Sequence, residues 1–235
     1  RLSTMGEMAT GIAHELNQPL SAIVNFANGC ARRMRLGIGE QEELIHAMQQ
    51  IAAQAKRAGE IIKRLRGMVS RQQPVRENVD LNVLVVDACT LIAHDRKKYQ
   101  VSIESRLSRQ PVMARVDPVQ IEQVILNLLR NALDSLKQCD PLGRHLVITT
   151  GINREGSAYI EVEDNGTGIA AEDLKHLFDP FFSTKKSGMG MGLSISQTIV
   201  TGHNGRIGAR SVPGRGAVFT VELPLSDATM ESEAS

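Results

Sequence analysis

The sequence predicts an α+β protein in which a helical hairpin is followed by a domain of mixed helices and strands. Two apolar seams with helical spacing occupy the first third of the chain. After a polar, proline-containing break, strand-like and helix-like segments alternate. We therefore expect a hairpin over residues 1–71, a linker over 72–78, the mixed domain over 79–226 and a disordered acidic tail over 227–235.

In the first third, apolar or small residues recur in alternating steps of three and four, which is the spacing of a helical bundle. The first seam comprises Leu2, Met5, Ala9, Ile12, Leu16, Ile23, Ala27, Cys30 and Met34, and the second Leu44, Met48, Ile51, Ala55, Ala58, Ile62, Leu65 and Val69. Gly37 and Gly39 suit the turn between the helices. Because one hairpin cannot bury both seams, we expect a homodimer through residues 1–70 that forms a four-helix bundle.

The mixed domain shows helical and strand-like patterns in a regular order. We expect helices over 81–95, 118–139 and 193–201, and strands over 101–104, 112–116, 146–150, 159–163, 206–210 and 217–223. The last two strands should pair antiparallel and close the domain.

Composition excludes several classes of protein. The 27 basic and 26 acidic side chains nearly cancel, so no basic surface for nucleic acid is predicted. Cys30, Cys89 and Cys139 lie far apart, which argues against a zinc site or a disulfide framework. No apolar run approaches the ~20 residues of a membrane helix. The chain begins at Arg1 inside a heptad pattern. We expect a cytoplasmic fragment whose membrane anchor, if any, belongs to a missing upstream region.

His14 is the first candidate for chemistry. With Leu2 at heptad position a, His14 falls at f and faces away from the seam. Its imidazole is mostly neutral at pH 7 and can act as a nucleophile, while Glu15 can orient the ring and accept a proton. Pro19 should kink the helix one turn later. A solvated surface histidine is the ordinary explanation for such a residue on its own.

The mixed domain contains neither a P-loop nor the protein-kinase catalytic loop. Asn127 and Asn131 share one helix face, and their amide oxygens suit a hydrated Mg²⁺. Asp164 ends a strand and can accept a hydrogen bond from an exocyclic amine, while Gly166 and Gly168 let the backbone approach a flat ring. A pair of surface amides and a plain D-N-G turn are the alternatives.

Two further segments follow in the sequence. Residues 177–186 combine three phenylalanines with Lys185 and Lys186, which are candidates for phosphate contact. Gly188, Gly190 and Gly192 lead directly into a helix, whose N-terminal amides can bind anions. A hydrophobic loop anchor for the phenylalanines and solvated lysines are the alternative explanations for the first of these segments.

Taken together, these segments resemble the histidine kinases of two-component signalling. Residues 11–20 (GIAHELNQPL) resemble the H-box, 127–134 the N-box, 164–168 the first glycine box, 178–182 the F-box and 188–192 the second glycine box. The resemblance implies a dimerisation and phosphotransfer hairpin, followed by an ATP-binding α/β sandwich of the Bergerat (GHKL) type. It implies ATP and Mg²⁺ as cofactors and the receiver domain of a response regulator as partner.

The resemblance also assigns roles. It implies that His14 is phosphorylated, that Glu15 assists proton transfer and that Gln18 helps to dephosphorylate the partner. It implies that Asn131, with Asn127, holds Mg²⁺, that Asp164 reads the adenine amine and that Thr220 supports this contact through water. The other residues expected to contact the nucleotide are Arg130, Gly166, Gly168, Ile169, Phe178, Thr184, Lys185, Gly188, Gly190, Gly192 and Leu193.

Two functions other than that of a kinase are considered, a gyrase-type ATPase and a non-enzymatic dimeric scaffold. Gyrase-type ATPases carry a glutamate base where this chain has Asn127, which cannot abstract a proton from water. We therefore expect slow hydrolysis, with ATP held under a lid over residues 170–190 until the domain swings about the linker to His14. A non-enzymatic dimeric scaffold is the second rival. Transfer within one chain and transfer between two chains both remain open.

Overall fold

The computed structural model describes residues 2–38, 41–69, 75–184 and 190–226, and the side chains of these except residues 2–15, 57 and 60–69. The chain divides into two compact units, Arg1–Arg71 and Gln72–Ser235. The first unit is helical and the second mixes helices and strands, so the predicted α+β class is confirmed.

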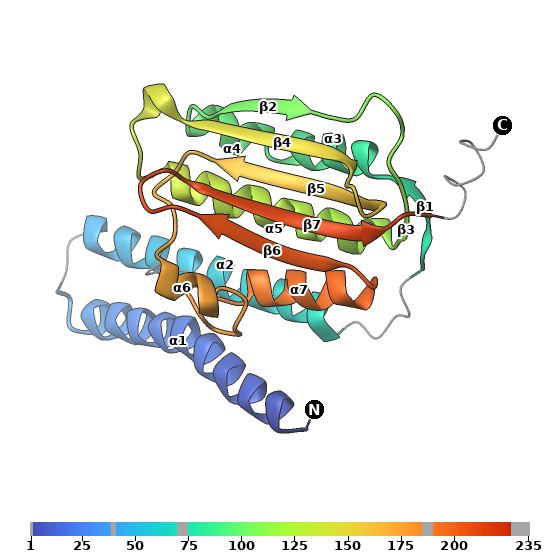
Figure 1. Ribbon diagram of the computed structural model, residues 1–235. Coiled ribbons are helices and arrows are strands. Elements are labelled where there is room, and N and C mark those ends of the chain that lie inside the picture. Colours follow the sequence, from blue (N-terminus) through green and yellow to red (C-terminus); the bar gives the residue numbers. More distant parts are fainter. Residues whose placement is uncertain (1, 39–40, 70–74, 185–189, 227–235) are drawn as a thin grey trace. The chain divides into compact units, whose positions relative to one another are not determined.

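The first unit is a hairpin of two long helices, as the two seams predict. Helix α1 spans Leu2–Arg35 and packs along α2, which spans Gln41–Val69. Helix α1 continues through Pro19, and its axis bends part-way along its length (Figure 1). At the turn, the Arg33 guanidinium lies 2.7 Å from the Glu43 carboxylate and ties the two helices together.

The second unit is built on a five-stranded sheet with the order β2-β4-β5-β7-β6 (Figure 1). Strands β2 and β4 are parallel, and the other neighbours are antiparallel, including the expected closing pair of β6 and β7. The bounds are β2 Ser102–Arg106, β4 His145–Ile152, β5 Ser157–Asp164, β6 Arg206–Ser211 and β7 Ala217–Pro224. A separate antiparallel pair joins β1, Glu77–Asp80, to β3, Met113–Val116.

Helices cover one face of the sheet (Figure 1). They are α3 Leu81–Leu91, α5 Pro118–Leu136 and α7 Gly192–Gly202. Alternate residues of the central strands, such as Ile160 and Val162, point into the core that these helices close, beside fully buried Leu128 and Leu129 of α5. The layered arrangement that the resemblance implies, with helices on one face of a mixed sheet, is therefore present.

Three local differences separate the structure from the sequence prediction. The helix expected over 81–95 ends at Leu91, and α4, Ala93–Lys98, begins after Ile92, whose side chain is buried at the junction. Residues 77 and 78, placed in the expected linker, begin β1. Helix α6, Ala171–His176, and a single turn at Pro141–Gly143 were not predicted. These elements have three to six residues, too few to show a periodicity.

His203 and Arg76 secure the C-terminal end of α7. The buried His203 ring contacts the Ile199 carbonyl through Nδ1 at 2.8 Å, and its Nε2 accepts from the backbone N–H of Asp117 at 3.0 Å. Asp117 is the N-cap of α5, so the ring joins the end of α7 to the start of α5. The Arg76 guanidinium donates to the Gly202 carbonyl at the same end of α7.

We predict that His203→Ala lowers the free energy of unfolding by roughly 2–4 kcal/mol, because it leaves a cavity and an unsatisfied backbone N–H at Asp117. Chemical denaturation measures the change. His94→Ala, which alters an exposed histidine of α4, should stay within about 0.5 kcal/mol of the unmodified chain. Equal effects of the two substitutions would refute the joining role of His203.

Candidate functional site

A polar stripe on α5 supplies the first side of the site. Asn127, Asn131 and Ser135 follow one another at four-residue spacing and so share one face of the helix, and all three are half-buried. The Asn127 amide donates to Ser196 Oγ of α7 at 3.0 Å, and that hydroxyl donates to the Gly192 carbonyl at 3.0 Å. The side chain of Asn127 is thereby held against the first turn of α7.

Gly192 is required for this close packing of α5 and α7. A Cβ at position 192 would lie 2.4 Å from Asn127 Oδ1, which is closer than real Cβ contacts. Helix α7 starts at Gly192, and Met191, its N-cap residue, offers the first-turn amides no side-chain hydrogen bond. Met191 therefore leaves the first-turn amides of this 11-residue helix without a side-chain cap.

Asp164 supplies the second side of the site, at the end of the central strand β5. Asp164 is buried, with 3% of its surface exposed. Its Oδ1 accepts from the backbone N–H of Gly166 at 2.9 Å and from Ser135 Oγ at 3.3 Å. The same Ser135 oxygen accepts from the N–H of Thr167 at 3.2 Å. Helix α5 and the loop over residues 165–169, the glycine loop, are therefore joined around the Asp164 carboxylate.

The glycine loop rests on the turn between β6 and β7. Gly168 has φ +71°, and a Cβ there would lie 2.4 Å from the Val212 carbonyl oxygen. The N–H of Ile169 donates to Ser211 Oγ at 2.8 Å, and the N–H of Gly214 donates to the Thr167 carbonyl at 2.7 Å. This backing gives the loop one conformation, which only glycine at 168 accommodates without strain.

The segment after the loop carries α6 and the expected phenylalanine cluster. Phe178, Phe181 and Phe182 are half-buried, so the role of hydrophobic anchors fits them. Gly190 has φ +63°, and a Cβ there would lie 2.3 Å from the Phe182 carbonyl oxygen, so this glycine fits closely against the segment. Thr184 is exposed, as is Arg130 on α5, while Leu193 packs against the core.

Asp134, the last residue of the N-box-like stretch, forms a surface ion pair at 2.6 Å with Lys137. Burial alone would lower the pKa of the Lys137 amine, but the hydrogen bond and charge of Asp134 outweigh it and raise the pKa above its ordinary value. The amine also lies 4.2 Å from the centroid of the Tyr99 ring. These contacts hold the Lys137 side chain at the C-terminal end of α5, where Lys137 is the C-cap residue.

The predicted role of Thr220 is wrong. In the β5–β7 register, Thr220 lies opposite Glu161 and donates to its carboxylate at 3.3 Å, whereas Asp164 lies opposite Ala217. Because successive residues of a strand alternate between faces, Thr220 and Asp164 point to opposite faces of the sheet. Thr220 therefore cannot support a contact made by Asp164.

The structure brings some of the predicted residues together, while others are exposed or lie outside the described residues. The structure brings Asp164 and Gly166 together, Gly168 and Ile169 together on the β6–β7 turn, and Asn127 against Gly192. His14 and Glu15 lie within α1, but their side chains are outside the described residues. Lys185 and Gly188 also lie outside the described residues, while Gln18 is an exposed residue of α1.

Three serines at the site were missed. Ser135, Ser196 and Ser211 provide hydroxyls that hold Asp164, Asn127 and the N–H of Ile169. For Ser135 a signal was available, because it continues the four-residue spacing of Asn127 and Asn131. The other two lie more than 40 residues from their partners, and no local pattern could have paired them.

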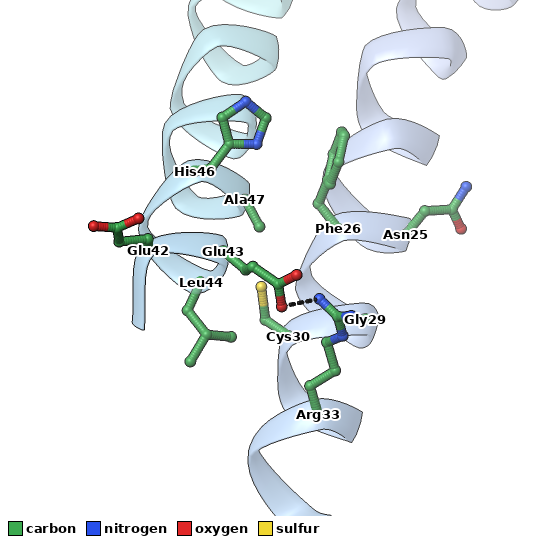
Figure 2. Close-up of a pocket in the computed structure, with 10 residues that line it drawn as sticks. All are labelled: Asn25, Phe26, Gly29, Cys30, Arg33, Glu42, Glu43, Leu44, His46 and Ala47. Atoms are coloured by element: carbon green, nitrogen blue, oxygen red, sulfur yellow. Dashed lines mark hydrogen bonds and ion pairs between the residues drawn. The ribbon is translucent and has the colours of Figure 1, made fainter. Parts of the chain in front are cut away.

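The hairpin has a groove of its own near the turn, with a volume of about 610 Å³ (Figure 2). It is lined by Asn25, Phe26, Gly29, Cys30, Arg33, Glu42, Glu43, Leu44, His46 and Ala47. Large apolar side chains are exposed on the same hairpin, namely Leu20, Val24, Phe26, Met34, Leu36, Ile38, Ile45 and Met48. An unaccompanied hairpin thus leaves apolar surface in contact with water.

Two family models match separate parts of the chain. Residues 4–74 match the His Kinase A phospho-acceptor domain. Residues 116–227 match the histidine kinase-, DNA gyrase B- and HSP90-like ATPase family. The second match contains both sides of the site described above.

Individual relatives align over nearly all of this chain. The sensor protein FixL of Bradyrhizobium diazoefficiens is 40% identical over 229 residues, which are 97% of this chain and 45% of FixL. The C4-dicarboxylate transport sensor protein DctS of Rhodobacter capsulatus is 38% identical, over 96% of this chain and 34% of DctS. The histidine kinase ThkA, solved in complex with the response regulator protein TrrA, superposes with a TM-score of 0.74 at 25% identity, over 96% of this chain and 63% of the matched chain.

The chain spans less than half the length of FixL and of DctS. Every helix within the described residues is too short or too polar to cross a lipid bilayer.

We predict that Gly168→Ala destabilises the α/β unit by roughly 2–3 kcal/mol, because alanine is strained at positive φ and its methyl group would overlap the Val212 carbonyl. Thermal or chemical unfolding measures the loss. Gly208→Ala in β6 is the matched control, since an added Cβ there meets nothing within 4 Å. A Gly168→Ala protein as stable as the control would contradict this account of the loop.

Proposed function

Because the chain belongs to the sensor histidine kinases of two-component signalling, we propose that it transfers the γ-phosphate of ATP to His14 and then to an aspartate of a response-regulator receiver domain. The observation that carries the proposal is the buried Asp164 carboxylate, held at the end of β5 by α5 and the glycine loop, in a chain that also contains a phospho-acceptor segment.

In this proposal Asp164 accepts a hydrogen bond from the exocyclic amine of adenine. A buried carboxylate held in one orientation by two donors is a selective acceptor, because a base lacking the amine would leave it without its ligand partner. Gly166 and Gly168 allow the backbone to lie close to the ring. The N-terminal amides of α7 are suited to the phosphates, since they lack a side-chain cap.

The residues of the polar stripe on α5 fit a magnesium ion that arrives with the phosphates. Asn131 and Asn127 offer neutral amide oxygens, and Mg²⁺ prefers oxygen ligands and keeps most of its water. Ser196 orients the Asn127 amide, so its oxygen is held in one direction. When bound, the ion would neutralise charge on the phosphate oxygens, and we assign its protein contacts to Asn131 and Asn127.

The transfer reaction requires positioning more than covalent chemistry from the ATP-binding domain. An imidazole nitrogen of His14 attacks the γ-phosphorus, the bond to the oxygen bridging the β- and γ-phosphates breaks, and ADP leaves. Glu15 accepts the imidazole proton as the N–P bond forms. We assign the added positive charge at the phosphates to Lys185 or Lys186, both outside the described residues. The phosphohistidine then donates its phosphoryl group to the carboxylate of the receiver domain.

We propose that the active form is a homodimer through residues 1–70. The exposed apolar side chains of α1 and α2, and the groove beside Phe26 and Cys30, provide apolar surface that a second hairpin would bury in a four-helix bundle. Gln18 is an exposed residue four positions after His14, which suits a role in dephosphorylating the partner. We propose that this reaction takes place in the cytoplasm, because ATP and receiver domains are found there.

A gyrase-like ATPase is disfavoured by Asn127. An amide cannot act as the base that activates water, and this one donates to Ser196. Asn127 therefore supplies no base for hydrolysis, and we expect the bound ATP to be hydrolysed slowly.

We predict that His14→Gln abolishes self-labelling by ATP and leaves ATP affinity within about twofold, whereas Asp164→Asn weakens ATP binding by at least roughly tenfold, because the amide presents a donor to a donor. Labelling with radioactive ATP, as acid-labile and base-stable phosphate, and equilibrium binding separate the two effects. His94→Gln is the control. Loss of binding in both variants, or steady ATP hydrolysis without labelling, would overturn the proposed division of roles.

We predict that chelation of divalent cations abolishes labelling, and that Asn131→Ala raises the Mg²⁺ concentration for half-maximal labelling on the order of tenfold. Gln138→Ala, which removes an exposed amide just beyond α5, should leave the Mg²⁺ titration unchanged. Coinciding titrations of the two variants would remove Asn131 from the metal site.

A further inference from the structure

Ser135 stands at the junction of α5, the glycine loop and Asp164, and neither the resemblance nor the matched families assigns it a role. Its side chain is half-buried, one helical turn beyond Asn131. We propose that Ser135 is a positioning residue for Asp164, and that its hydroxyl sets the preference of the pocket for a base with an exocyclic amine. The inference rests on the proposed function of the ATP site.

The hydrogen bonds around Ser135 Oγ define the direction of its proton. A hydroxyl has one donor and can accept up to two bonds. The N–H of Thr167 donates to Oγ at 3.2 Å, so Oγ acts as an acceptor toward the loop. The single O–H is then directed to Asp164 Oδ1, 3.3 Å away, and the carboxylate receives it. Ser135 therefore connects the loop backbone at Thr167 to the carboxylate of Asp164 through two hydrogen bonds.

A second donor makes the orientation of the carboxylate specific. The N–H of Gly166 reaches the same oxygen, Oδ1, at 2.9 Å. Two donors from different segments, one on α5 and one on the loop, fix the plane of the carboxyl group. Removing the serine hydroxyl would take away the donor that α5 supplies and would let the carboxyl group turn from this direction. The affected property is the direction in which Asp164 presents its acceptor, while its burial would persist.

Gly166 is fitted to this arrangement. A Cβ at position 166 would lie 2.0 Å from Ser135 Oγ and 2.6 Å from Asp164 Oδ1. Any side chain at 166 would displace the hydroxyl from the carboxylate. The glycine of the loop is therefore matched to the serine of α5, in addition to permitting close approach of a ligand.

Selectivity for the amine distinguishes positioning from general stability. The intact 235-residue chain is compared with Ser135→Ala for binding of ATP and of purine riboside 5′-triphosphate, which lacks the 6-amino group. The unmodified chain should bind ATP more tightly than the analogue by roughly tenfold, the value of one good hydrogen bond to a charged acceptor. Ser135→Ala should bind ATP about fivefold more weakly and the analogue within about twofold, so the ratio falls.

Thr90→Ala is the matched control, because the Thr90 hydroxyl bonds the Val86 carbonyl of its own helix. It should retain the full ratio, and thermal unfolding of all three proteins checks their stability. Equal losses of ATP and analogue in Ser135→Ala, or an unchanged ratio, would overturn the role of Ser135 while ATP binding by the unmodified chain upholds the site. An unmodified chain that binds neither nucleotide would overturn the proposed function and this inference together.

Discussion

The rotation of α5 about its axis is the constraint on which the site depends. The helix buries Ile121, Ile125, Leu128 and Leu129 completely against the sheet. Each such side chain contributes about 1.5–3 kcal/mol, whereas a single polar contact contributes about 1 kcal/mol. Burial of the apolar face therefore sets the rotation of α5. This rotation turns the stripe of Asn127, Asn131 and Ser135 toward α7 and the glycine loop. Polar groups that would be costly elsewhere meet partners on α7 and the glycine loop.

Strand register places the second half of the site. Asp164 lies opposite Leu146 on β4 and Ala217 on β7, in the middle of the five-stranded sheet. Its position is thus determined by long-range pairing, and the glycine loop that follows it is held by the turn between β6 and β7. Residues separated by about fifty positions in the sequence therefore form one compact loop system.

The sequence was informative where a pattern is local. The apolar periodicity predicted helix α5. The sequence also singled out the glycines at 166, 168, 190 and 192, and the structure shows that a side chain at any of them would clash. The prediction was wrong for Thr220, because a shift of one residue in a strand reverses its face, and register is not visible in a single sequence. Strand β1 was missed because Val79 is its only apolar residue. The serines that orient Asp164 and Asn127 depend on tertiary contacts.

Arg76 and β1 determine where the α/β unit can be cut from the helical hairpin without loss of structure. The strand pairs with β3, and the Arg76 guanidinium satisfies a carbonyl at the end of α7. Both lie ahead of Leu81, where the first helix of the α/β unit begins. A truncation placed at that helix would remove an edge of the small sheet and the cap of α7 at once. The segment expected to be a linker, residues 72–78, therefore includes residues that belong to the folded α/β unit. A fragment that is to fold on its own has to begin upstream of Arg76.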